Sequence, residues 1–167
     1  SRKLVSHDFA VLRFDFTGLG GSEGDFSDTN FTTNLEDVST VANWLKSNYQ
    51  PASLLIGHSL GGTAILAASP TLPDAKAIVT IGAPSDPNLI LNLIGEANVL
   101  QIENDGEANV ILEGRQFKIK RQFLVDAEQQ KVLHLLRKND RPLMIMHSPN
   151  DKTGPIEHAT NLYLAAK

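Results

Sequence analysis

Residues 57–62 read Gly-His-Ser-Leu-Gly-Gly, and this stretch decides the fold. An apolar run, Ser53–Gly57, comes before it, and a run of small residues, Gly61–Ser69, comes after it. The apolar run predicts a buried strand and the small residues predict a helix. A serine between two glycines, where a strand turns into a helix, is the pattern of a sharp turn that exposes a nucleophilic hydroxyl. The pattern predicts Ser59 as a nucleophile; the alternative is a tight glycine-rich turn with a serine N-cap.

The residues beside Ser59 have expected roles of their own. Larger side chains at Gly57 or Gly61 are expected to clash within so sharp a turn. The N–H of Leu60 directly follows the serine at a helix N-terminus, so we expect it to donate to an oxyanion in an oxyanion hole. His58 points to a different side of the turn from its neighbour, and we interpret it as a packing residue.

Asp151 is the candidate acid. The apolar run Pro142–Met146 predicts a strand, and His-Ser-Pro-Asn-Asp follows it at positions 147–151. A carboxylate just past a strand is well placed to orient a catalytic histidine and to stabilise its charged form. The order Ser59 before Asp151 fits one known arrangement of the triad. The alternative is an aspartate at a turn or helix start, where Asn-Asp is common.

None of the five histidines is a convincing general base. His158 lies in a probable helix, and no further strand follows to present it at the sheet edge. His147 precedes the acid, and we interpret it as shaping the acid's turn. His134 lies between the last two predicted strands, and His7 lies before the first. A serine without a base attacks slowly, so we expect an incomplete site and a chain that is weakly active or inactive by itself.

Outward from the turn, apolar runs alternate with helical patterns. Near-continuous hydrophobic runs suit strands buried on both faces of a parallel sheet, and they occur at Ala10–Phe16, Ser53–Gly57, Ala77–Ile81 and Leu143–Met146. Helical stripes run from Leu35 to Leu45, after a capping box at Thr33–Glu36, and from Ile156 through Tyr163 to Ala166. The alternation predicts an α/β fold with right-handed parallel crossovers.

Residues 88–141 interrupt the alternation and are too long for a crossover loop. Asn109–Leu112 and Gln116–Lys120 flank Glu113-Gly114-Arg115, which predicts a hairpin, and Phe123–Arg137 reads as a helix. We call residues 88–141 the insertion and interpret it as a lid over the functional edge, because loops after strands build sites in such folds. A surface decoration is the alternative. Residues 1–87 and 142–167 then form the core.

The glycines that follow the first predicted strand do not form a nucleotide-binding loop. Gly18, Gly20, Gly21 and Gly24 lack the G-x-G-x-x-G spacing, because position 23 is Glu23, and no Gly-Lys-Ser/Thr follows. We expect a close-packed structural loop near the active edge.

The composition of the chain limits the classes of partner that it is expected to bind. The net charge of −4 argues against nucleic acid, and no apolar run approaches a membrane span. The absence of cysteine excludes thiol chemistry and disulfides and fits a cytoplasmic protein. No signal peptide precedes the first predicted strand.

We expect no cofactor and no metal. The chain starts without Met and stops within a helical pattern, so we expect both ends to be cut from a longer protein.

Three stretches, residues 13–24, 57–62 and 142–151, resemble the α/β-hydrolase superfamily in that order along the chain. The Phe-Asp-Phe-Thr-Gly-Leu-Gly form, with Arg121–Leu124 behind the hairpin, looks most like the hydrolase half of bifunctional α/β-hydrolase/OsmC-like proteins. The resemblance implies a truncated α/β-hydrolase with a mostly parallel sheet. It also implies Ser59 as nucleophile, Asp151 as acid, Leu60 as oxyanion donor and a small ester, thioester or amide as substrate. A non-catalytic binding or assembly module is the alternative.

The resemblance also implies parts that these 167 residues do not contain. Family members carry upstream strands, one of them followed by a second oxyanion donor, and a downstream strand whose loop bears the histidine. One upstream strand would lie between Ala10–Phe16 and Ser53–Gly57. Either these two runs re-pair, or another chain fills the gap, or the natural protein is longer. The exposed sheet edges would allow self-association.

Overall fold

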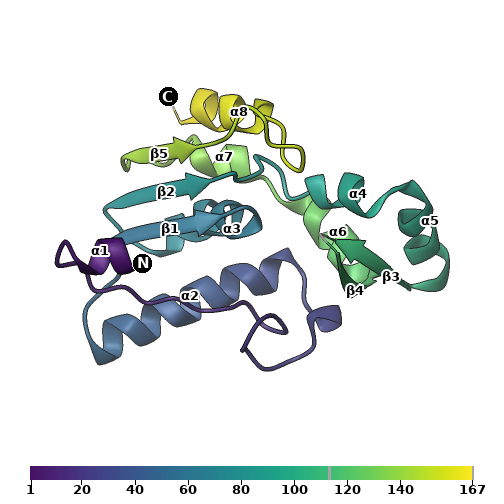
Figure 1. Ribbon diagram of the computed structural model, residues 1–167, viewed down its shortest axis with the longest axis horizontal. Helices are drawn as coiled ribbons and strands as arrows, with labels where there is room; N and C mark the ends of the chain where they lie inside the picture. The colour runs from purple at the N-terminus through teal and green to yellow at the C-terminus, as the bar shows by residue number, and fades with distance from the viewer. Residues whose placement is uncertain (113, 167) are drawn as a thin grey trace.

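The computed structural model describes residues 1–112 and 114–166. Glu113, which the sequence places in the hairpin turn, and Lys167 lie outside the described residues. Figure 1 shows two groups of elements: a parallel sheet with its helices, and a smaller group around an antiparallel hairpin. The second group is built from the insertion.

The sheet contains three of the four predicted strands. β1 (Leu54–His58), β2 (Ala77–Ile81) and β5 (Leu143–Met146) are parallel, in the order β1-β2-β5. These bounds confirm the three predictions to within one residue. Because all three strands run the same way, their carboxyl ends meet at one edge of the sheet.

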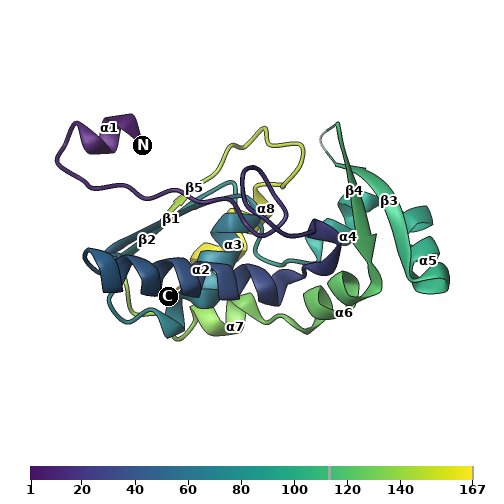
Figure 2. The same cartoon turned by 90° about the horizontal axis from the view of Figure 1, so that it is seen from below.

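The prediction of a strand at Ala10–Phe16 is wrong. Figures 1 and 2 show these residues as a drawn-out trace that leaves the short helix α1 (Arg2–Val5) and passes the sheet. Apolar residues form a strand only where a neighbouring backbone offers hydrogen bonds, and within the described residues no strand pairs with this segment. Phe9 and Phe14 are consequently exposed. The two runs therefore do not re-pair across the gap that the resemblance implies.

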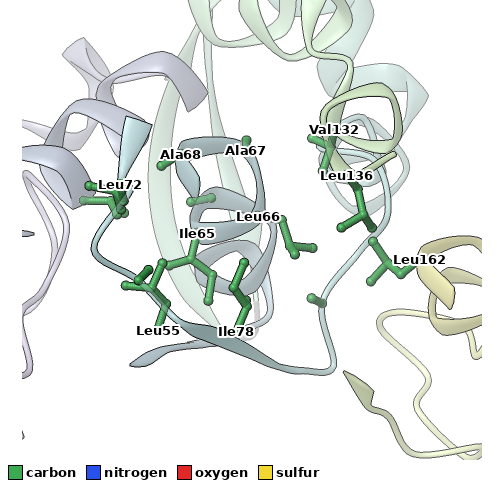
Figure 3. Close-up of a cluster of buried hydrophobic side chains, with 14 of the residues drawn as sticks. Leu55, Ile65, Leu66, Ala67, Ala68, Leu72, Ile78, Val132, Leu136 and Leu162 are labelled. Atoms are coloured by element: carbon green, nitrogen blue, oxygen red, sulfur yellow. The ribbon is translucent and has the colours of Figure 1, made fainter. Parts of the chain in front are cut away.

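Helices cover one face of the sheet, as Figure 2 shows. They are α2 (Phe31–Asn48), α3 (Leu60–Ala68) with the 3₁₀ turn η2 (Ser69–Thr71), α7 (Val132–Leu136) and α8 (Glu157–Ala165). Figure 3 shows their buried cluster, in which Leu66 of α3 lies between the strand residue Ile78 and the helical residues Leu136 and Leu162. Each such side chain contributes about 1.5–3 kcal/mol by leaving water, so this cluster fixes α3 on the sheet.

Two helix details differ from the sequence predictions. The capping box of α2 joins Asn30 to Thr33, whose side chains and N–H groups bond reciprocally at 2.9 and 2.8 Å. The predicted Thr33–Glu36 box is wrong because the fully buried Phe31 extends the helix toward the N-terminus. In α8, Leu162 is buried whereas Tyr163 is 58% exposed, so Tyr163 is not part of the buried stripe.

The opposite face of the sheet carries exposed apolar side chains. Ile56, Met144 and Met146 are 44%, 59% and 49% exposed, and their neighbours in sequence face the helices. The strands were predicted to be buried on both faces, but within the described residues only one face is covered. Among the helices of the described chain, none combines the length and apolarity that a membrane crossing requires.

The insertion has an apolar cluster of its own. The elements that build this cluster are α4 (Leu89–Ile94), α5 (Glu96–Asp105), the antiparallel strands β3 (Glu107–Leu112) and β4 (Arg115–Lys120), and α6 (Arg121–Gln129). The paired strands lie where the sequence predicts a hairpin. The predicted helix Phe123–Arg137 is broken after Gln129, and its second part, α7, packs in the core beside α3.

Phe26 joins the insertion to the core. It begins the 3₁₀ turn η1 (Phe26–Asp28) and its ring lies 5.1 Å from that of Phe117 and 6.0 Å from that of Phe123. Asp126 of α6 also accepts hydrogen bonds from the N–H and hydroxyl of Thr32 at 2.7 and 2.5 Å. These contacts hold the insertion against the start of α2.

Candidate active site

Three chain segments meet where the strands end. The register aligns the last residues of β1, β2 and β5, so Ser59, Gly82 and His147 follow at the same level. Ser59 N–H donates to Ile81 O at 2.9 Å, and Gly82 N–H donates to Met146 O at 2.8 Å. The ladder thus continues one residue past β1 and β2 and fixes this edge.

Ser59 has a strained backbone. Its φ of 51° and ψ of −128° lie where side chains are rarely found, and such a conformation costs on the order of 1–3 kcal/mol. The strain is held by the ladder bond on one side and on the other by Gly62 N–H, which donates to Ser59 O at 2.9 Å. The half-buried serine therefore stands at a sharp turn of the predicted kind.

Two glycines are required by close packing in this turn, and one of them was not predicted. A Cβ on Gly57 would collide with the backbone of Gly61 and lie 2.6 Å from Gly62 Cα. A Cβ on Gly62 would lie 2.6 Å from Ala83 Cβ. At Gly61 the nearest atom would be a ring carbon at 3.7 Å. The expected clash at Gly61 is thus wrong, because a Cβ there would make only ordinary contact with Phe16, whereas Gly62 faces Ala83.

Leu60 is the first residue of α3. The first N–H groups of a helix have no acceptor within the helix and carry the positive end of its dipole. Leu60 N–H, directly after Ser59, is therefore a donor without an acceptor inside the helix. Thr63, fully buried one turn later, donates from its hydroxyl to Pro84 O at 2.7 Å and ties α3 to the segment after β2.

Asp151 lies in the loop after β5 and is oriented by backbone donors. Its Oδ1 accepts from Thr153 N–H at 2.9 Å and from Gly154 N–H at 3.0 Å. These two bonds, Gly154 first, lower the pKa of Asp151, and the nearby His147 and His58 rings lower it further. Asp151 therefore carries its charge at neutral pH.

The second oxygen of Asp151 faces the middle strand. Asp151 Oδ2 lies 3.5 Å from where a Cβ of Gly82 would be. β2 separates β1 from β5, so Gly82 lies between Ser59 and Asp151. No side chain of Gly82 therefore stands between the serine and the aspartate.

Two histidines close to the acid are committed to other partners. His158 Nδ1 accepts from Ser85 N–H at 3.1 Å and lies 3.0 Å from Ser85 Oγ. Burial, and secondarily His147, lower the pKa of His158, so the neutral ring is favoured. His147 Nε2 lies 2.7 Å from Gly154 O.

The other three histidines are exposed. They are His7, His58 and His134, and among the described residues none forms a hydrogen bond with the Ser59 hydroxyl. His58 was predicted to be a packing residue, which is wrong: it lies on the open face of the sheet. His58 lies on that face because side chains alternate between the two faces along β1, and the alternate positions face the helices.

The glycine loop satisfies its own hydrogen-bonding groups. Gly18 N–H donates to Glu23 O at 2.9 Å, and Gly21 N–H donates to Asp15 Oδ2 at 3.0 Å. Thr17 donates from both its N–H and its hydroxyl to Asp37. Backbone donors that would cradle a phosphate are thus used internally, beside carboxylates that would repel it, as the structural interpretation requires.

Sequence reasoning missed Gly82, Gly62, Gly154 and Ser85. Gly82 had a usable signal, since a glycine directly after a predicted strand often adopts a positive φ or allows close approach, and Gly82 does have a positive φ. Gly62 and Ser85 meet partners from distant segments, Ala83 and His158, so they left no local pattern. The partners of Gly154 lie three and seven residues away, at Asp151 and His147, but the sequence does not show that the loop folds back on itself. Within residues 1–112 and 114–166, no cluster of side chains is arranged to hold a metal ion.

The sequence of this chain resembles those of known proteins. Residues 2–155 match the Alpha/beta hydrolase family. The mouse protein named palmitoyl-protein thioesterase ABHD10, mitochondrial, is 26% identical over 162 residues, covering 92% of this chain and 52% of its own length. Its human counterpart is 25% identical and is covered over 50% of its length. The chain thus spans about half the length of these curated relatives.

Solved structures agree with the fold. The esterase domain of a Rhodothermus marinus protein is 41% identical, with a TM-score of 0.65, over 87% of this chain and 59% of that one. Est1E from Butyrivibrio proteoclasticus, with ferulic acid bound, is 22% identical with a TM-score of 0.73, over 90% of this chain and 61% of that one. The second likeness bears on the fold alone.

Proposed function

This chain belongs to the alpha/beta hydrolase family and has its fold, and from that premise we propose that it carries the core of a serine hydrolase. The observation that carries the proposal is Ser59, held in a strained turn at the N-terminus of α3. Strain of this kind persists where a functional group must be presented. In the proposal Ser59 is the nucleophile, Asp151 the acid and Leu60 N–H one oxyanion donor.

The proposed reaction passes through an acyl-enzyme. Ser59 Oγ attacks the acyl carbon, a base takes the hydroxyl proton, and Leu60 N–H stabilises the oxyanion. The bond to the leaving group breaks and the leaving group takes the proton. Water then releases the acid and restores Ser59. Asp151 would hold the base in its working orientation.

The base is proposed to be none of the five histidines in these residues. His147 and His158 are bonded to Gly154 and Ser85, and among the described residues no histidine is hydrogen-bonded to the Ser59 hydroxyl. A serine hydroxyl without a base stays protonated at neutral pH. We therefore propose that these residues alone form an incomplete site.

An acyl ester or thioester is the proposed substrate. The mouse and human relatives are named as palmitoyl-protein thioesterases and the Rhodothermus protein domain as an esterase. The insertion supplies apolar side chains, among them the partly buried Leu91 and Phe117 and the exposed Leu93. We propose that the insertion is a lid whose apolar residues line an acyl site.

Labelling with a fluorophosphonate tests the nucleophile and the missing base together. The 167-residue chain and S59A are incubated with the probe, with and without added imidazole, and the modified residue is identified by mass spectrometry. We expect slow labelling of Ser59 and no labelling in S59A. Added imidazole should accelerate the labelling of Ser59, because it can act as the missing base. A longer product of the same gene is expected to label rapidly without imidazole.

Two outcomes would contradict the proposal. Rapid labelling of the 167-residue chain without imidazole would place a working base within it. Failure of Ser59 to react in the longer product as well would favour the non-catalytic binding or assembly module, for which the exposed sheet face with Ile56, Met144 and Met146 is the supporting observation.

Three narrower expectations stay predictions. The likeness to hydrolases joined to OsmC-like domains rests on residues 13–24 and on Arg121–Leu124, and the neighbouring coding sequence tests it. A cytoplasmic location is tested by cell fractionation. Self-association through the free edges of β1 and β5 is tested by sedimentation.

A further inference from the structure

We propose that His147 is a positioning residue that sets the orientation of Asp151 through the backbone of Gly154. The inference rests on the proposed function, in which Asp151 is the acid. It concerns a histidine that cannot be the general base, and it gives that histidine a different task.

Gly154 lies at the centre of this arrangement. Its N–H donates to Asp151 Oδ1 at 3.0 Å, and its carbonyl lies 2.7 Å from His147 Nε2. A carbonyl oxygen only accepts, so the His147 nitrogen is the donor. Gly154 is buried. Its carbonyl thus accepts from the histidine, and its N–H orients the carboxylate.

The hydrogen bond of His147 goes to Gly154 rather than to the acid itself. His147 Nε2 lies 3.9 Å from Asp151 Oδ2, beyond hydrogen-bond distance. The proton on Nε2 is directed at the Gly154 carbonyl. The Asp151 oxygen that faces Gly82 is left for another partner.

His147 is fixed in one form. Its side chain is 1% exposed, and its Nδ1 is buried without a hydrogen-bond partner among the described residues. A proton on Nδ1 would be buried without an acceptor, which is costly. The ring proton therefore sits on Nε2, where it is donated to Gly154 O.

Two amide substitutions separate positioning from filling of space. In H147Q the side-chain NH₂ reaches the place of Nε2 and can still donate to Gly154 O. In H147N the NH₂ takes the place of Nδ1, which has no partner, and the bond to Gly154 is lost. Both variants are polar and smaller than histidine, so a residue that only fills space would respond similarly to both. H134N changes an exposed histidine in the same way and is the control.

The first readout needs no chemistry at Ser59. The carboxyl carbon of Asp151 is titrated by NMR in the 167-residue chain. We expect wild type, H147Q and H134N to keep the pKa of Asp151 below its ordinary 3.8, and H147N to raise it toward that value as the two backbone donors move. If H147N does not fold, H147L replaces it, since leucine keeps the volume without a donor.

The second readout is the imidazole-assisted labelling of Ser59. We expect it to fall roughly tenfold to a hundredfold in H147N, because misplacement of a supporting group by about 1 Å costs that much, and to recover in H147Q. An Asp151 titration that is unchanged in H147N and H147L, or equally shifted in H147Q, would overturn the inference. A shifted titration with no Ser59 labelling in any variant would instead reject the proposed function and leave the positioning intact.

Discussion

Gly62→Ala should destabilise the protein, whereas Gly61→Ala should not. Both residues lie in the first turn of α3, but they face different surroundings. The Cβ of G62A would lie 2.6 Å from Ala83 Cβ and 3.0 Å from Gly57 O. Ordinary carbon contacts are about 3.5–4.0 Å, so roughly 1 Å is missing. An alanine Cβ and a backbone carbonyl cannot rotate away, so the backbone must move.

The expected loss follows from two opposing effects. Overpacking of a rigid site costs about 1–3 kcal/mol, and alanine in place of glycine returns at most about 1 kcal/mol of helix propensity. G62A should thus lose about 1–2 kcal/mol of unfolding free energy. In G61A the nearest atom is 3.7 Å away, so only the propensity gain remains. This pair compares the same substitution in the same helical turn.

Urea unfolding followed by circular dichroism measures the difference. With a slope of about 2 kcal/mol per molar urea, the midpoint of G62A should fall by roughly 0.5–1 M, and that of G61A should stay or rise. Equal midpoints for the two variants would refute the packing of α3 against the segment after β2. A lower midpoint for G61A alone would mean that the helix is rotated relative to the described arrangement.

The remaining predictions concern strain, protonation and the insertion. Ser59→Gly should have a higher free energy of unfolding than S59A, by up to about 2 kcal/mol. Glycine releases about 1–3 kcal/mol of backbone strain, and its greater entropy in the unfolded chain opposes this by about 0.5–1 kcal/mol. Equal urea midpoints for the two variants would show an unstrained turn. The lowered pKa of His158 means that the unfolded chain binds a proton more readily than the folded chain, so the unfolding free energy should fall as pH drops from 6.5 through the folded pKa. H158N, whose side-chain oxygen can still accept from Ser85, should flatten that part of the stability curve, and an unchanged slope would assign the effect elsewhere. Phe26→Ala should lower the free energy of unfolding by about 2 kcal/mol, half the cost of a fully buried Phe, and expose the insertion to limited proteolysis. The control F9A, at an exposed site, should do neither. Equal digestion of the two variants would show that Phe26 does not hold the insertion.

Much of the fold was predictable because its signals are local. The apolar runs that became β1, β2 and β5 are short and continuous, and the glycine spacing around Ser59 specifies a turn whatever the rest of the chain does. The position of Asp151 just after β5 follows from the same kind of pattern. These features depend on neighbours within a few residues.

Pairing and close contact were decided only by the tertiary structure. Ala10–Phe16 has the composition of a strand, but a strand needs a second backbone beside it, and no described strand lies within reach. Whether Gly61 or Gly62 must be a glycine depends on where Ala83 arrives from the next strand.

The candidate site divides in the same way. The sequence by itself predicted Ser59 and Asp151 as candidates, because a serine at a strand-to-helix turn and an aspartate after a later strand are read from residue order. Only the tertiary structure decided that His147 and His158 are bonded to Gly154 and Ser85 and that Asp151 Oδ2 faces Gly82. The physical reason is that a hydrogen bond joins atoms that are close in space, and the fold sets that distance.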